Sequence, residues 1–246
     1  MFNQLSRRFA EASKSQKFNG MILFGLPGAG KGTYGSLVAK DFKVYKIAPG
    51  DLLRKILKED WFKSDPHYKT IKDAVEGGKL VADNVVLDLV STEYNRNAAN
   101  YNGVLFDGIP RTVRQAQLLK EKFDLSKFLL VNVILREDIL IEKLLGRRVC
   151  DGCGKNYNVC SIHKDGYEME PLLSAKDDNC EVCNGKLIQR SDDKEDIIKK
   201  RIEVYKQETF PVMAELQKIV WRTMDFEPKR GVKDYPLLKK SIEDLK

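Results

Sequence analysis

Cysteine is absent from most of this sequence: all five cysteines of the 246-residue chain lie between positions 150 and 183. A secreted disulfide scaffold spreads its cysteines through the chain, and no apolar signal segment precedes these, so we do not expect that class. The chain also lacks any apolar run close to the ~18 residues needed to span a bilayer, so we expect a soluble protein without a membrane partner. It contains no internal repeat and no low-complexity tract.

Neither sign of charge dominates the composition. The chain has 43 basic and 36 acidic residues and a formal net charge of +7. An enzyme that holds two polyphosphates carries such a charge as readily as a nucleic-acid binder does. The length is enough to bury a large core, either as one domain with insertions or as two domains.

The first 17 residues are poor in acids. This segment contains only one acidic residue, Glu11, but four basic residues, Arg7, Arg8, Lys14 and Lys17. Its apolar residues recur at three- and four-residue spacing, which places them on one face of a helix. A basic, amphipathic and acid-poor segment is typical of mitochondrial targeting. We therefore predict a location in the mitochondrial matrix. A solvated N-terminal extension on a cytoplasmic protein is the alternative.

One stretch organises the remaining chain. Residues 25–33 read Gly-Leu-Pro-Gly-Ala-Gly-Lys-Gly-Thr, after the apolar run 21–24 and before a helix-compatible run. Strand, glycine-rich turn and helix predict a phosphate-binding loop, in which backbone N–H groups and a helix N-terminus hold an anion. Lys31 adds an ammonium for the phosphates. Gly32 stands where the general pattern has Ser or Thr, and the hydroxyl arrives one position later at Thr33.

Further apolar runs alternate with helical patterns. We expect strands at 44–47, 104–106 and 128–135, and helices from Leu52, with Asp51 as its cap, and at 66–76, 83–97 and 138–145. This alternation predicts a parallel sheet. Asp107 and Arg111 follow the strand at 104–106, and ligands bind outside the carboxyl ends of parallel strands, so we expect both near the phosphate-binding loop.

The alternation stops at two Cys-x-x-Cys pairs. Cys150, Cys153, Cys180 and Cys183 satisfy the ligand set of a tetrahedral zinc ion. Two disulfides or free thiols are the alternatives. We interpret Cys160 as a buried thiol and His163 as a surface histidine. Beyond this segment we expect a long helix that starts at residues 192–196 and ends or kinks at Pro211, followed by a helical stretch over 212–220.

These motifs together resemble the adenylate kinase family of nucleoside monophosphate kinases, in its long form with a zinc-bearing lid. The likeness runs from about residue 18 to 220 and includes the phosphate-binding loop, residues 50–54, 78–81, 107–112 with Gln115, 146–148, and 190–201. It implies an α/β fold: a P-loop, three-layer, doubly wound parallel sheet with a helical AMP-binding insert and a small zinc lid. The implied parts are an extension at 1–17, a core at 18–48, 79–146 and 187–246, an AMP-binding flap at 49–78, and a lid at 147–186.

The resemblance also implies roles for individual residues. Donor phosphates would be held by Gly28, Ala29, Gly30, Lys31, Gly32 and Thr33. AMP would be bound by Gly50, Arg54, Lys79, Val81, Gly108, Arg111 and Gln115, of which Gln115 contacts the adenine. Catalysis would depend on Lys31, Asp107, Arg111, Arg147, Arg190 and Arg201, with Asp107 binding Mg²⁺ through water. The implied cofactors are Mg²⁺ with a nucleoside triphosphate and structural Zn²⁺, and we expect a monomer.

Several residues depart from the family pattern. Tyr34 stands where glutamine is common, Lys143 replaces an arginine that usually stacks on the donor base, and the C-terminal base loop is unrecognisable. The mitochondrial GTP:AMP branch also departs at two of these places, so we predict GTP as the donor, with ATP as the alternative. Ala48 and Pro49 depart on the AMP side.

Two other classes of function fit the sequence less well. A zinc-ribbon protein that binds nucleic acid is disfavoured because the cysteine region lacks interleaved basic and aromatic residues. A catalytically dead nucleotide-binding regulator is disfavoured because the lysine, the acid and the arginines are all present. We therefore predict a phosphotransferase that transfers a phosphoryl group reversibly to AMP and binds no nucleic acid.

Overall fold

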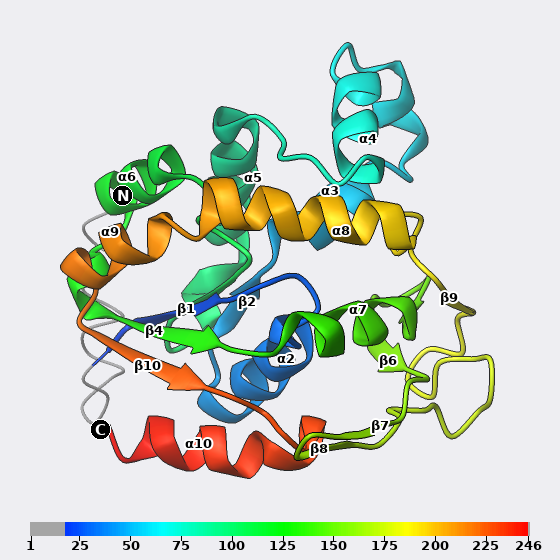
Figure 1. The fold of residues 1–246 in the computed structure, drawn as a ribbon. Coiled ribbons are helices and arrows are strands. Elements are labelled where there is room, and N and C mark those ends of the chain that lie inside the picture. The colour runs from blue at the N-terminus through cyan, green and yellow to red at the C-terminus, as the bar shows by residue number, and fades with distance from the viewer. Residues whose placement is uncertain (1–17, 246) are drawn as a thin grey trace.

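A five-stranded parallel sheet lies at the centre of the computed structural model, which describes residues 18–245 (Figure 1). Its strand order is β10-β4-β1-β3-β2. The strands are β1 (Gly20–Phe24), β2 (Tyr45–Ile47), β3 (Val104–Asp107), β4 (Phe128–Val133) and β10 (Arg222–Phe226). The predicted parallel sheet is confirmed, and it gains one edge strand, β10, that the sequence did not reveal.

Helices cover both faces of the sheet. Met21 and Leu23 of β1 pack into a core shared with α2 (Lys31–Phe42), α7 (Glu137–Leu145) and α10 (Tyr235–Glu243). Ile22 and Phe24 face the opposite core, formed with α5 (Asp83–Asn97), α6 (Val113–Lys122) and α9 (Val212–Ile219). Because both faces are covered, the strand is apolar along its whole length. This is the predicted three-layer α/β fold.

Two segments stand at the carboxyl-terminal edge of the sheet (Figure 1). The helical segment (residues 49–78) contains α3 (Pro49–Ile56), the short 3₁₀ helix η1 (Asp60–Ser64) and α4 (Tyr68–Glu76), which pack on a small core of Leu53, Phe62 and Ile71. The cysteine segment (residues 147–188) contains β5 (Arg147–Cys150), β6 (Asn156–Asn158), β7 (Ile162–Lys164), β8 (Tyr167–Met169) and β9 (Leu187–Ile188). Strands β6, β5 and β9 form an antiparallel sheet, and β7 and β8 form a hairpin.

The chain returns from the cysteine segment through α8 (Glu195–Val204) and a π-helical turn, η4 (Tyr205–Thr209), before α9. Short 3₁₀ turns complete the fold at η2 (Ala98–Asn100), η3 (Leu125–Lys127) and η5 (Gly231–Asp234). None of the helices in this described part of the chain has both the length and the apolarity to cross a bilayer.

One expected helix start is wrong and another is confirmed. Helix α3 begins at Pro49 with Ala48 as its cap, so Asp51 lies inside the first turn and caps nothing. Proline suits that first position because its missing N–H would have no partner within the helix. Helix α8 begins at Glu195, within the expected range of residues 192–196, and Asp192 precedes it. Asp51 and Asp192 instead form ion pairs with arginines, described below.

Candidate active site

The phosphate-binding loop is shaped by glycines with positive φ. At Gly25 φ is 132°, and a Cβ there would lie 2.3 Å from the carbonyl oxygen of Val133 in β4. Gly30 has φ of 94° and caps α2, whose first turn contains no acidic residue. The N-terminal N–H groups of α2 therefore face the cleft without a carboxylate to satisfy them, which favours an anion. Gly28, Gly30, Gly32 and Thr33 line this cleft, and Ala29 is buried beneath it.

Lys31 is the first residue of α2. Its Nζ donates to the carbonyl oxygens of Gly25 and Leu26, at 2.5 and 2.7 Å. Burial lowers the pKa of Lys31 from 10.5 to about 7; Asp107 opposes this shift, while Arg111 and other arginines reinforce it. A lysine so close to its neutral form gains its charge readily when a polyphosphate arrives.

Asp107 ends β3 beside the phosphate-binding loop. A Cβ on Gly32 would lie 3.7 Å from its Oδ2. Lys46 of β2 lies on the other side, with its Nζ 3.6 Å from the same oxygen. Lys46 also donates to the carbonyl oxygen of Gly32, at 3.1 Å. Lys46 could not be selected from the sequence, because a single lysine in a short strand has no distinguishing pattern.

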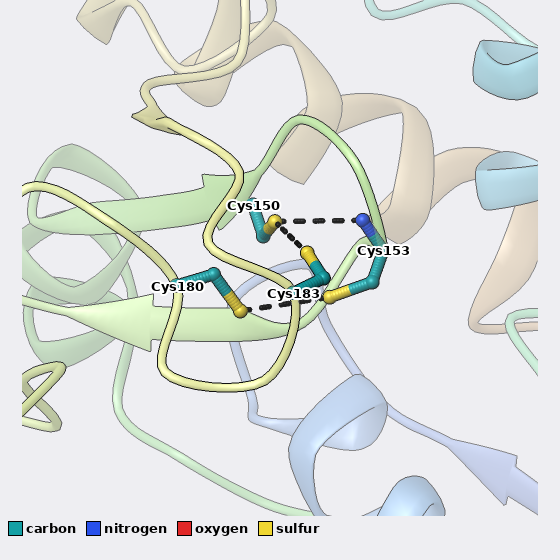
Figure 2. Close-up of side chains that lie close together, drawn as sticks. All are labelled: Cys150, Cys153, Cys180 and Cys183. Atoms are coloured by element: carbon teal, nitrogen blue, oxygen red, sulfur yellow. Dashed lines mark hydrogen bonds between the residues drawn. The ribbon is translucent and has the colours of Figure 1, made fainter. Parts of the chain in front are cut away.

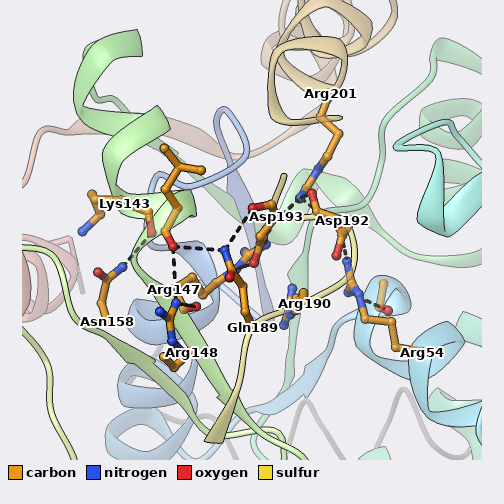
Figure 3. Close-up of polar contacts among 12 residues, drawn as sticks. Arg54, Lys143, Arg147, Arg148, Asn158, Gln189, Arg190, Asp192, Asp193 and Arg201 are labelled. Carbon is orange, nitrogen blue, oxygen red and sulfur yellow. Dashed lines mark hydrogen bonds and ion pairs between the residues drawn. The ribbon is translucent and has the colours of Figure 1, made fainter. Parts of the chain in front are cut away.

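An arginine cluster joins the two segments (Figure 3). Arg54 of α3 pairs with Asp192 at 3.0 Å, and Arg190 pairs with Asp51 of α3 at 2.9 Å. Arg147 of β5 and Arg201 of α8 both pair with Asp193; the Arg201 contact is 3.3 Å. Arginines that the sequence places far apart therefore meet in one cleft.

In this cluster, burial and neighbouring charges shift the pKa of Asp192 in opposite directions. Burial alone would raise the pKa of Asp192, but the guanidinium groups of Arg54, Arg201 and Arg147 outweigh it and hold that pKa well below the usual range. Burial and the nearby Arg54 lower the pKa of Arg190 to about 9. Excess positive charge in an enclosed cleft is relieved by a bound anion.

Some donors in the cluster have no acceptor. The Nε atoms of Arg54 and Arg190 are buried without a hydrogen-bond partner. Arg111 donates from Nε to the carbonyl oxygen of Gly108 at 2.8 Å, and within residues 18–245 its guanidinium forms no ion pair with a carboxylate. Buried donors without partners are costly, so these groups mark where an anionic ligand would complete the hydrogen bonding.

The cleft extends from this cluster in two directions. Towards the helical segment it is lined by the predicted AMP-binding residues Gly50, Arg54, Lys79, Val81, Gly108, Arg111 and Gln115. Gly78, which precedes Lys79, has φ of 69°, and a Cβ there would lie 2.7 Å from Cγ of Arg201. The helical segment therefore packs directly against the arginine cluster.

In the other direction the cleft reaches Tyr34, Lys143 and the C-terminal loop at Gly231. Lys143 of α7 is half-buried, and its Nζ lies 3.7 Å from Sδ of Met169. In the described chain it pairs with no carboxylate, and burial lowers its pKa. Cys160 also lines this end and is partly exposed, so the expectation of a buried thiol is wrong.

The four cysteines of the two pairs lie close together in the cysteine segment (Figure 2). Their sulfur atoms all lie within 4.8 Å of one another, with Cys150 and Cys183 at 3.3 Å and Cys153 and Cys180 at 3.6 Å. These separations exceed an S–S bond of about 2.05 Å and are close to the roughly 3.8 Å between sulfurs around one tetrahedral ion. The cluster is therefore able to hold a metal ion.

A residue with positive φ follows each Cys-x-x-Cys pair. Gly154 follows the first pair with φ of 75°, and Asn184 follows the second with φ of 59°. Both values lie in the left-handed region, which glycine and asparagine tolerate best. His163 lies apart on the surface, beside Glu168, as predicted for a histidine that is not a ligand.

The carboxylates of the arginine cluster are the functional residues that the sequence did not identify. Asp192 and Asp193 follow Arg190 closely, which was a usable signal, but acids before a helical pattern are also typical of a helix start. Asp193 is fully enclosed and Asp192 nearly so. Two buried neighbouring acids are rare unless paired, so burial is what separates the two interpretations.

Comparison with known proteins agrees with this geometry. The family model for adenylate kinase matches residues 23–220. A GTP:AMP phosphotransferase of Plasmodium falciparum is 37% identical over 219 residues, covering 87% of this chain and 92% of its own. An adenylate kinase of Solanum tuberosum is 43% identical over 194 residues, covering 78% of this chain and 65% of its own. The chloroplastic adenylate kinase 1 of Arabidopsis thaliana is 36% identical over 218 residues, covering 86% and 72%.

The parallel sheet, the phosphate-binding loop and the arginine-lined cleft define a P-loop phosphotransferase that acts on nucleotides. Within that class, the chain belongs to the adenylate kinase family. It is an enzyme that transfers phosphoryl groups between nucleotides and AMP.

Proposed function

We propose that this protein is a GTP:AMP phosphotransferase, which transfers the terminal phosphoryl group of a magnesium-bound GTP reversibly to AMP and yields GDP and ADP. The observation that carries the proposal is a single cleft with two arms, one towards the helical segment and one towards Lys143 and the C-terminal loop, that meet at Lys31 and the arginine cluster. Phosphoryl transfer needs positioning and charge stabilisation more than a nucleophilic side chain, and this cleft supplies both.

In this proposal each cleft residue has a role that follows from its position. The phosphate-binding loop and Lys31 bind the donor phosphates, and Arg54 and Arg111 bind the AMP phosphate. Arg147, Arg190 and Arg201 surround the phosphoryl group during transfer, when its charge spreads over three oxygens. Asp107 and the hydroxyl of Thr33 flank the loop and would hold Mg²⁺ through its water shell, and the ion would neutralise charge on the phosphates.

The same layout supports a flap and a lid, the two parts implied by the family resemblance. We assign residues 49–78 as an AMP-binding flap and residues 147–186 as a lid, because each stands at the carboxyl edge of the sheet and contributes one arginine to the cleft, Arg54 and Arg147 respectively. Closing both over the nucleotides excludes water, which would otherwise hydrolyse the donor. The four sulfur atoms fit a tetrahedral zinc ion with no open position, so zinc would be structural.

The position of Lys143 in the cleft supports GTP over ATP as the phosphoryl donor. Its ammonium lines the cleft with three N–H donors and no carboxylate partner in the described chain. Guanine presents a carbonyl oxygen at position 6, which accepts such a donor, whereas adenine presents an amine there, which does not. The Plasmodium relative named for GTP:AMP transfer is a second support.

A steady-state assay with Mg²⁺ and AMP tests the proposal. We expect kcat/KM for GTP to exceed that for ATP, and Lys143→Met to lower the GTP value about tenfold while ATP changes less, as for one lost charged hydrogen bond. A wild-type ratio that favours ATP identifies an ordinary ATP:AMP adenylate kinase. If AMP is not phosphorylated in the presence of GTP or in the presence of ATP, the assignment is refuted entirely.

Location is proposed from the N-terminus together with relatives. Several relatives are named as chloroplastic, which supports an organelle, and the acid-poor segment 1–17, outside the described residues, supports the mitochondrial matrix. We expect residues 1–17 to carry a fluorescent reporter into mitochondria and Arg7→Glu with Arg8→Glu to abolish import. A reporter that stays cytosolic in both forms favours the solvated extension. We also propose a monomer, which sedimentation at micromolar concentration tests.

A further inference from the structure

The side-chain amide of Gln115 is engaged on both sides. Gln115 lies in the first turn of α6, lines the AMP arm of the cleft and is only 2% exposed. Its Oε1 accepts a hydrogen bond of 2.7 Å from the backbone N–H of Arg111. Its Nε2 donates a hydrogen bond of 2.9 Å to Oδ1 of Asp83, the first residue of α5.

These two partners fix which way the amide points. A backbone N–H can only donate and a carboxylate can only accept, so the oxygen of Gln115 must face Arg111 and its nitrogen must face Asp83. Turning the amide by 180° would set two donors against each other at one end and two acceptors at the other. In a buried site both mismatches are costly, so one orientation prevails.

Asp83 is itself held in place. Its Oδ2 accepts a hydrogen bond of 3.0 Å from the hydroxyl of Thr112. That hydroxyl also accepts from the backbone N–H of Gln115 at 3.0 Å, as the cap of α6. The carboxylate, the hydroxyl and the amide therefore form a closed network between the starts of α5 and α6.

We propose that Asp83 is a positioning residue that makes the acceptor site selective for a 6-aminopurine. With its orientation fixed, Gln115 keeps one N–H and one oxygen lone pair for a ligand, in a set order. Adenine matches an amide with a donor at N6 and an acceptor at a neighbouring ring nitrogen. Hypoxanthine carries an acceptor oxygen at position 6 instead, which would meet Oε1 of Gln115. The inference rests on the proposed binding of AMP in this arm.

The test compares two phosphoryl acceptors, AMP and IMP, whose bases carry an amine and an oxygen, respectively, at position 6. Initial rates with AMP and with IMP, on one enzyme preparation and one donor, give a ratio of kcat/KM that does not depend on the active fraction. In Asp83→Ala the amide nitrogen loses its acceptor and only the N–H of Arg111 still orients the amide, so we expect the AMP/IMP ratio to fall about tenfold or more. Asp83→Asn keeps an acceptor oxygen for Gln115 and should keep a ratio within about threefold of wild type.

Two controls separate positioning from general loosening. Val90→Ala removes buried volume from the same helix without touching the network, and its ratio should equal that of wild type. In a Gln115→Ala background, Asp83→Ala should leave the ratio unchanged, because Asp83 acts through the amide.

Each outcome has a separate meaning. If wild type phosphorylates AMP but Asp83→Ala keeps its AMP/IMP ratio, the positioning role is refuted while the proposed function stands. The positioning role is also refuted if the AMP/IMP ratio falls as far in Val90→Ala as in Asp83→Ala. It is refuted as well if adding Asp83→Ala to Gln115→Ala lowers the ratio further. A wild type that accepts neither AMP nor IMP refutes the proposed function and, with it, this inference.

Discussion

The hydroxyl of Tyr34 donates a 2.8 Å hydrogen bond to the carbonyl oxygen of Gly231, 197 residues further along the chain. Tyr34 lies in α2 directly after the phosphate-binding loop, and Gly231 begins η5 in the C-terminal loop. The ring is buried and packs edge-on against Phe226 of β10, with centroids 5.2 Å apart. Two places where the sequence departs from the family pattern therefore contact each other and line the same end of the cleft.

We expect Tyr34→Phe to shift donor preference towards ATP. The change frees a carbonyl acceptor at the donor end, where it would accept from the 6-amino group of adenine and repel the 6-oxygen of guanine. The kcat/KM ratio of GTP to ATP should fall about fivefold, and the free energy of unfolding should fall by about 1 kcal/mol. Tyr235→Phe is a matched control, because it removes a tyrosine hydroxyl that donates to Asp41 away from the cleft. An equal shift in both variants would contradict the role of Tyr34.

The fold could be predicted from the sequence wherever one signal acted alone. Residues 21–24 and 128–131 are continuously apolar because both faces of the sheet are covered, and the phosphate-binding loop carries its own glycine spacing. Strand β10 escaped prediction because an edge strand needs fewer apolar residues: in Arg222–Phe226 only Met224 and Phe226 are apolar.

Some residues of the candidate site could be predicted from the sequence and others could not. Lys31, Asp107 and the four cysteines could be selected because their motifs are local in sequence. The partners of the arginines could not, since Asp51 and Arg190 lie 139 residues apart in the sequence and meet only in the folded protein. The same holds for Asp83 and Gln115, which come from different helices. Local spacing reports which groups are present, whereas the hydrogen bonds that orient them depend on tertiary packing.

Removing metal from the cysteine cluster should loosen the cysteine segment and leave the sheet folded. We expect about one zinc per chain by elemental analysis, and Cys150→Ser should abolish it and lower the melting temperature. Cys160→Ser is the matched control, because the fifth cysteine lies outside the cluster. It should keep its zinc and its melting temperature. A metal-free wild type that is as stable as the zinc-loaded protein would contradict a structural role.

Replacing the charged groups at the junction of the two arms should impair transfer far more than stability. Lys31→Met and Arg111→Ala should each lower kcat/KM by about two orders of magnitude or more, because each removes charge stabilisation of roughly 3 kcal/mol. Lys206→Met, which removes an exposed ion pair with Glu137, should leave both activity and stability close to wild type. Near wild-type turnover in Lys31→Met and Arg111→Ala would show that transfer occurs elsewhere.

The lowered pKa of Lys31 predicts that nucleotide binding takes up a proton. Burial holds this pKa at about 7 in the free enzyme, against 10.5 in an exposed lysine. At pH 8 the free side chain is therefore largely neutral, and a bound triphosphate raises its pKa and charges it. Isothermal titration of GDP or GTP with Mg²⁺ in two buffers of different ionisation enthalpy should show uptake approaching one proton at pH 8. At pH 6 the lysine is already charged, so uptake should be small.

The same shift sets the sign of a stability change. Between pH 7 and 10.5 the unfolded chain binds more protons at Lys31 than the folded chain does, so this group makes the free energy of unfolding rise with pH across that window. Lys31→Arg keeps a charge that does not titrate there, so it should lose both the proton uptake at pH 8 and this contribution to the pH dependence. Proton uptake that is equal in wild type and Lys31→Arg would assign the titrating group to the nucleotide rather than to Lys31, and would contradict the lowered pKa.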